Sequence, residues 1–106
     1  KIGVNAAASS ALGNNDSGIK ISFSSNNTVG GTTPESANII GGNTVKGAGI
    51  EIAEVNTTGN TVQGNYIGTN SAGDNLGNKT GVILRAGATD NTIGGTSAAE
   101  SNSIAN

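Results

Sequence analysis

The sequence predicts an all-β fold, a right-handed parallel β-helix (solenoid) of about three rungs with three short strands each and no cap. Short apolar peptides recur along the chain at intervals of about 31 to 33 residues. The larger apolar residues are nearly all isoleucine and valine, whose β-branched side chains favour strands over helices. No apolar segment combines the length and the periodicity of an amphipathic helix.

The composition is typical of one thin-cored domain, which we expect to span residues 1–106. Only 33% of the residues are hydrophobic, but only 11% are charged, whereas disordered chains are normally rich in charge. The net charge of −2 argues against nucleic acid as a partner, and no apolar run is long enough to span a membrane. Because the chain lacks cysteine and histidine, we expect no cofactor and no metal site.

The first strand of each rung is predicted from the pattern Gly-apolar-x-apolar, at residues 18–21, 49–52 and 81–84. Alternation along a strand turns every second side chain toward the same face. The inward side chains of this column are predicted to be Ile19, Ile21, Ile50, Ile52, Val82 and Leu84.

The second and third strands are predicted from two patterns that begin with asparagine. Asn-Thr-apolar occurs at residues 27–29, 60–62 and 91–93, and Asn-x-Ile at residues 38–40, 65–67 and 102–104. A further copy of the third column opens the chain at Ile2. The inward side chains of these columns are predicted to be Val29, Val62, Ile93, Ile40, Ile67 and Ile104.

These columns divide the chain into rungs at approximately residues 18–43, 44–78 and 79–106, with residues 1–17 ending a preceding rung. Longer matches lie about 64 residues apart, so two kinds of rung alternate. The loops between the columns differ in length from rung to rung, which favours the right-handed form of the solenoid. We place these variable loops at residues 5–15, 31–37, 53–59, 69–80 and 96–101.

Asparagine recurs at equivalent corners of successive rungs. Side-chain amides in register can hydrogen-bond along a stack, and asparagine tolerates the left-handed backbone conformation that tight corners need. We therefore expect structural ladders rather than a ligand site. The expected ladders are Asn27, Asn60 and Asn91; Asn38, Asn65 and Asn102; and Asn5, Asn43, Asn70 and Asn106.

The strings NNTVGGT, GNTVQGNYIGTN and NTIGGTSAAESN carry a family resemblance. They resemble the Asn/Gly-rich repeats of bacterial secreted and surface proteins of the pectin-lyase-like β-helix superfamily. The resemblance covers essentially the whole chain and implies the right-handed parallel β-helix. It does not select a function, because polysaccharide-active enzymes and structural surface proteins share this fold.

One cluster of charged residues is a candidate site. Lys20, Glu51 and Ile83 are predicted to share an outward column, with Arg85 in the next one. We interpret Lys20, Glu51 and Arg85 as a cross-strand ion cluster, and binding by these three residues is the alternative. Only Glu54 is close enough in sequence to supply a second carboxylate, so we expect no catalytic pair and no enzymatic activity.

The favoured function is a structural or adhesive β-solenoid module, extracellular or at the cell surface. Its partners would be copies of itself, stacked end to end into a filament, or neighbouring repeats of a longer chain, since the chain begins and ends in the same column. One alternative is a fragment of a polysaccharide-active lyase or glycoside hydrolase. Another is a passive carbohydrate-binding face, for which Tyr66 and Phe23 are the exposed aromatic candidates.

Overall fold

The computed structural model describes residues 1–105 and contains three parallel sheets of three strands each. The first sheet joins β1 (Ile19–Ser22), β4 (Ile50–Ala53) and β7 (Val82–Arg85). The second sheet joins β2 (Thr28–Gly30), β5 (Thr61–Gln63) and β8 (Thr92–Ile93). The third sheet joins β3 (Ile39–Ile40), β6 (Tyr66–Ile67) and β9 (Ser103–Ile104). The predicted all-β parallel solenoid is confirmed.

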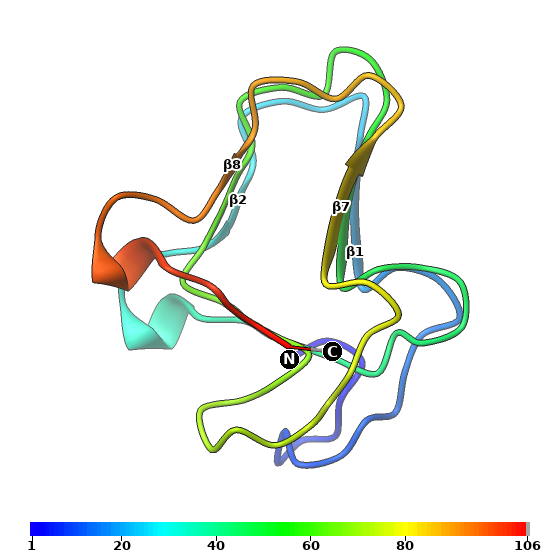
Figure 1. Ribbon diagram of the computed structural model, residues 1–106, viewed down its shortest axis with the longest axis vertical. Helices are drawn as coiled ribbons and strands as arrows, with labels where there is room; N and C mark the ends of the chain where they lie inside the picture. Colours follow the sequence, from blue (N-terminus) through cyan, green and yellow to red (C-terminus); the bar gives the residue numbers. More distant parts are fainter. Residues whose placement is uncertain (106) are drawn as a thin grey trace.

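The chain passes through the three sheets in the same order in every rung, so each strand pairs with its counterpart one rung later. In Figure 1, which looks along the stack, β1 and β7 overlie on one side and β2 and β8 on another. The trace runs counter-clockwise as it comes toward the viewer, which makes the coil right-handed. Parallel strands joined by crossover connections take this hand almost without exception.

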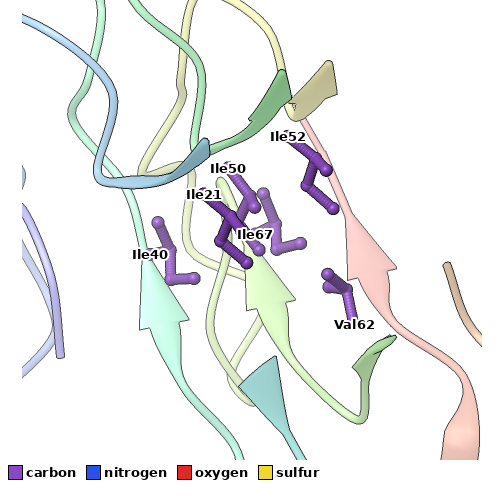
Figure 2. Close-up of a cluster of buried hydrophobic side chains, with 6 residues drawn as sticks. All are labelled: Ile21, Ile40, Ile50, Ile52, Val62 and Ile67. Atoms are coloured by element: carbon purple, nitrogen blue, oxygen red, sulfur yellow. The ribbon is translucent and has the colours of Figure 1, made fainter. Parts of the chain in front are cut away.

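The strand register brings like residues together along the stack. Ile21 pairs with Ile52 in the first sheet, and Ile40 pairs with Ile67 in the third. Their side chains converge in the interior (Figure 2), where they form one buried cluster. The buried members of this cluster are Ile21, Ile40, Ile50, Ile52, Val62 and Ile67.

Burial is uneven along the stack because only the middle rung has neighbours on both sides. Leu84, Ile93 and Ile104 hold the expected register with Ile52, Val62 and Ile67, but they are 42%, 36% and 49% exposed. The prediction that these three residues are core residues is therefore wrong for this chain, since no described rung covers them. Three further predicted core residues are only partly buried, namely Ile19, Val29 and Val82.

Two 3₁₀ turns, which the sequence patterns did not predict, lie within expected loops. They are η1 (Pro34–Ser36) and η2 (Ala98–Glu100), and both project from the same corner of the solenoid in Figure 1. Glu100 Oε2 accepts the backbone N–H groups of Thr96 and Ser97 at 2.7 and 2.8 Å. The hydrogen bonds from Ser97 and Thr96 lower the pKa of Glu100.

Left-handed backbone conformations mark the corners between the first and second sheets. Asn26, Gly59 and Asp90, each directly before a second-column asparagine, have φ values of 61°, 67° and 55°. Glycine, asparagine and aspartate are the residues that adopt this conformation most readily, which explains why they occur there. Among the described residues, no helix is long and apolar enough to cross a membrane.

Candidate functional site

The second-column asparagines are joined along the stack by paired hydrogen bonds. The backbone N–H and the Nδ2 of Asn27 both donate to Oδ1 of Asn60, each at 2.9 Å. Asn60 repeats this geometry with Oδ1 of Asn91, again at 2.9 Å for both bonds. Each amide therefore satisfies two donors of the preceding rung with one oxygen.

The third-column asparagines form a second ladder of the same geometry. Asn38 donates to Oδ1 of Asn65 at 3.1 and 3.0 Å, and Asn65 donates to Oδ1 of Asn102 at 3.0 and 3.1 Å. Asn65 Nδ2 also donates to the carbonyl of Val29, and Asn102 Nδ2 to the carbonyl of Val62. The side chains thus tie each rung to both the rung before it and the rung after it.

A third ladder consists of Asn14, Asn43 and Asn78. Asn14 Nδ2 donates to Oδ1 of Asn43 at 2.9 Å, and Asn43 Nδ2 donates to Oδ1 of Asn78 at the same distance. Asn43 is completely buried, and Asn78 is nearly so. The signal for this ladder was present in the sequence, since Leu12-Gly13-Asn14 matches Leu76-Gly77-Asn78.

The expected set of Asn5, Asn43, Asn70 and Asn106 is wrong for Asn5 and Asn70, and Asn106 lies outside the described residues. Asn5 and Asn70 instead fold their own long loops, because each Oδ1 accepts two backbone N–H groups a few residues later. Asn70 Nδ2 also donates to the carbonyl of Ala8 at 2.8 Å, so the two long loops are in contact.

All three ladders have the same polarity, with donors in one rung and the acceptor in the next. Among the described residues, Oδ1 of Asn27 and Oδ1 of Asn38 accept no hydrogen bond at one end of the stack. At the other end the backbone N–H groups of Asn91 and Asn102 have no acceptor within the described part of the chain. The two ends are therefore complementary to each other.

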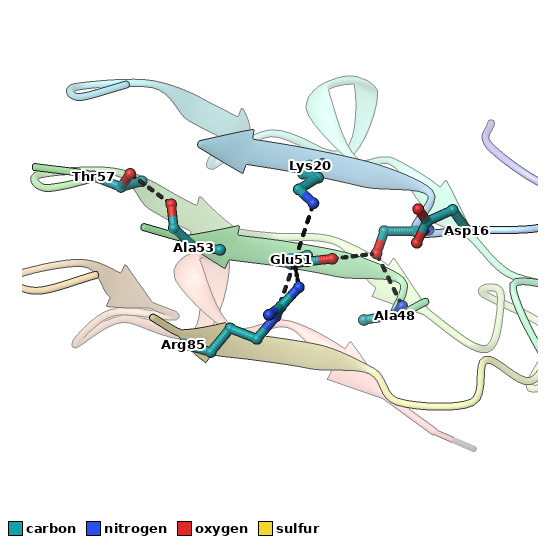
Figure 3. Close-up of polar contacts among 8 residues, drawn as sticks. Asp16, Lys20, Ala48, Glu51, Ala53, Thr57 and Arg85 are labelled. Carbon is teal, nitrogen blue, oxygen red and sulfur yellow. Dashed lines mark hydrogen bonds and ion pairs between the residues drawn. The ribbon is translucent and has the colours of Figure 1, made fainter. Parts of the chain in front are cut away.

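The charged cluster on the outer face of the first sheet is centred on Glu51 in β4. Its side chain is 5% exposed and lies between Lys20 of β1 and Arg85 of β7, as Figure 3 shows. Oε1 receives Arg85 Nη2 at 2.6 Å and Arg85 Nε at 3.0 Å, with Lys20 Nζ at 3.5 Å. The structure thus brings together the three residues that the sequence placed on this face.

Ser17, which no sequence pattern indicated, completes the surroundings of Glu51. Its hydroxyl donates to Oε2 of Glu51 at 2.9 Å and accepts the backbone N–H of Ala48 at 3.1 Å. Burial by itself raises the pKa of Glu51. The hydrogen bonds from Ser17 and Arg85, with the charges of Lys20 and Arg85, outweigh that effect and leave the pKa below its ordinary value.

This arrangement keeps Glu51 ionised and both of its oxygens occupied. A general acid needs a raised pKa, and a nucleophilic carboxylate needs an open path to its substrate. Within the described residues, Glu54 makes no hydrogen bond or ion pair with Glu51 and follows β4 with a left-handed φ of 81°. The geometry is that of an ion cluster that joins three strands of one sheet.

The aromatic candidates for carbohydrate binding lie apart. Phe23 is 70% exposed at the corner after β1. Tyr66 is partly buried on the outer face of the third sheet and lines a hollow of about 610 Å³ between η1 and η2. Comparisons of the chain with models of protein families, with curated proteins and with solved structures find no match.

Proposed function

We propose that this chain is a structural or adhesive module of an extracellular or cell-surface protein, and that further rungs stack on its two end rungs. Those rungs come either from a second copy, which gives a filament, or from neighbouring repeats of a longer chain. We also propose that the chain is related to the Asn/Gly-rich repeats of the pectin-lyase-like superfamily. The parallel sheets and the stacked asparagines support that relationship.

The observation that carries the proposal is that apolar and polar columns both run through the stack and stay open at its last rung. Leu84 and Ile104 expose apolar surface there, on the edge strands β7 and β9. Uncovered strand edges are sites for pairing with further strands. The common polarity of the Asn ladders permits head-to-tail stacking, and a repeated head-to-tail contact gives an open assembly rather than a closed dimer.

Electron microscopy of the purified chain over a series of concentrations tests the filament form of the proposal. We expect filaments with a rise of roughly 14 Å per chain, which is three rungs at about 4.8 Å each. Leu84→Lys is expected to abolish them, because it places a charge on the end rung. Val55→Lys is the matched control, since Val55 is 57% exposed but belongs to the middle rung.

Monomers at every concentration would exclude self-assembly and leave neighbouring repeats as the partner.

An assay for polysaccharide cleavage tests the structural role against the enzymatic alternative. Depolymerisation of a polysaccharide by the wild-type chain, with loss of that activity in Glu51→Gln, would overturn the proposal.

A further inference from the structure

The cations of this chain are concentrated around one hollow. The chain has five lysines and arginines, and four of them line a hollow of about 390 Å³ beside the start of the first sheet. These four are Lys20, Lys46, Lys79 and Arg85. Two carboxylates, Asp16 and Glu51, also line it, which leaves a formal charge of +2. The rest of the chain, with one lysine and five carboxylates, carries −4.

Glu51 neutralises only part of the positive charge that lines this hollow. Its buried carboxylate pairs with Lys20 and Arg85, and its second oxygen is occupied by Ser17. It therefore fixes the two cations in place while presenting little negative surface to solvent. The side chains of Lys46 and Lys79 are exposed and form no ion pair within the described residues.

The backbone places these two lysines next to the fixed cations. Lys46 lies in the segment that leads into β4, and Lys79 lies in the segment that leads into β7. The backbone N–H of Lys79 donates to the carbonyl of Asn43 at 2.9 Å, which anchors that segment to the third ladder. Lys46 and Lys79 thus line the same hollow as an arginine that Glu51 already holds in one orientation.

We propose that this hollow binds a small multivalent oxyanion, phosphate or sulfate, either as a free ion or as a substituent of a larger polymer. Lysine acts as a mobile point charge, and charge-assisted hydrogen bonds to oxyanions are the stronger class of hydrogen bond. A doubly charged ion neutralises the +2 of the hollow. This site does not depend on the proposed stacking, because its lining residues come from the three rungs of one chain and lie on the outer side of the solenoid.

The test is a titration of the whole chain with sodium sulfate and with sodium phosphate, followed by NMR chemical shifts and calorimetry. Sodium chloride holds the ionic strength constant. We expect saturable shifts around Lys46, Lys79 and Arg85. The double variant Lys46→Ala/Lys79→Ala is expected to weaken binding by about tenfold or more, since two charge-assisted contacts are lost.

Lys1→Ala is the matched control, because Lys1 is the lysine that does not line the hollow. It is expected to bind like the wild-type chain. Shifts that do not saturate, or an equal weakening in the double variant and in Lys1→Ala, would overturn the proposal. An unchanged far-ultraviolet circular dichroism spectrum of the double variant shows that the fold is retained.

Dextran sulfate and unsulfated dextran distinguish the two sources of the anion. Tighter binding of dextran sulfate than of free sulfate, with none of dextran, identifies a polymer substituent as the ligand. Equal affinity per sulfate group identifies the free ion. Binding of dextran sulfate that the double variant retains in full would contradict the site.

Discussion

Asn60 is completely buried, and its Nδ2 donates to Oδ1 of Asn91 at 2.9 Å. The same Nδ2 donates to the carbonyl of Ser24 at 3.1 Å, and Asn60 Oδ1 accepts both donors of Asn27. One amide therefore joins three consecutive rungs. The thin apolar core is supplemented by such amides, whose polar atoms are satisfied only when the rungs are in register.

Asn60→Ala is expected to lower the free energy of unfolding by about 3 kcal/mol, because it removes the hydrogen bonds that the buried Asn60 amide makes with Asn27, Asn91 and the carbonyl of Ser24. Urea unfolding followed by circular dichroism measures the change. Asn15→Ala is the control, since Asn15 is exposed and makes no side-chain hydrogen bond within the described residues. A loss for Asn60→Ala no larger than that for Asn15→Ala would show that the ladder does not stabilise the fold.

The ion cluster predicts a pH-dependent stability. The pKa of Glu51 is depressed in the folded chain, so this carboxylate stabilises the fold above its ordinary pKa of about 4.3. The contribution disappears as the pH falls through the depressed pKa. Glu51→Gln is expected to lower the free energy of unfolding by about 1–2 kcal/mol at pH 7, and by less at low pH. The loss is modest because Lys20 and Arg85 are both about half exposed to solvent. Equal losses in urea at pH 7 and pH 3 would contradict this account.

Two glycines with left-handed backbone conformations allow the effect of conformational strain on stability to be distinguished from the effect of close packing. Gly64 has φ +68°, and a Cβ added there would overlap the carbonyl oxygen of Gly31 in the neighbouring rung. Gly73 has φ +82° in open space. Gly64→Ala is expected to destabilise the chain by about 1–3 kcal/mol more than Gly73→Ala in thermal unfolding. Equal effects would mean that the rungs are not in close contact at this corner.

The uneven burial along one core column gives a further prediction. Ile52 and Leu84 are register partners, but Ile52 is completely buried and Leu84 is 42% exposed. In dilute monomer, Ile52→Ala is expected to cost about 2–5 kcal/mol and Leu84→Ala about 1 kcal/mol. Similar costs, measured by urea unfolding at low concentration, would show that Leu84 is covered.

The repeat made most of the fold predictable. Because parallel strands pair with their own counterparts, the spacing of Gly18, Gly49 and Gly81 was enough to align the first sheet. The second and third sheets followed from their Asn-containing patterns in the same way. Burial was less predictable, because it depends on which rungs have neighbours and not on the repeat itself.

The loops were the least predictable part. The η1 and η2 turns are fixed by local hydrogen bonds such as those of Glu100, which leave no periodic signal. Within the candidate site, the sequence placed Glu51 and its two cations on one face, but it could not place Ser17. Ser17 precedes β1, and its hydroxyl lies between Glu51 and the N–H of Ala48 of the next rung, a contact that no repeating pattern marks.

Amide hydrogen exchange measured by NMR in dilute monomer tests most directly whether asparagine ladders hold the rungs together in register. The backbone N–H groups of Asn60 and Asn65 donate to the following rung, whereas those of Asn91 and Asn102 have no acceptor within the described residues. We expect strong protection of the first pair and rapid exchange of the second pair. Equally rapid exchange at all four amides would contradict this expectation.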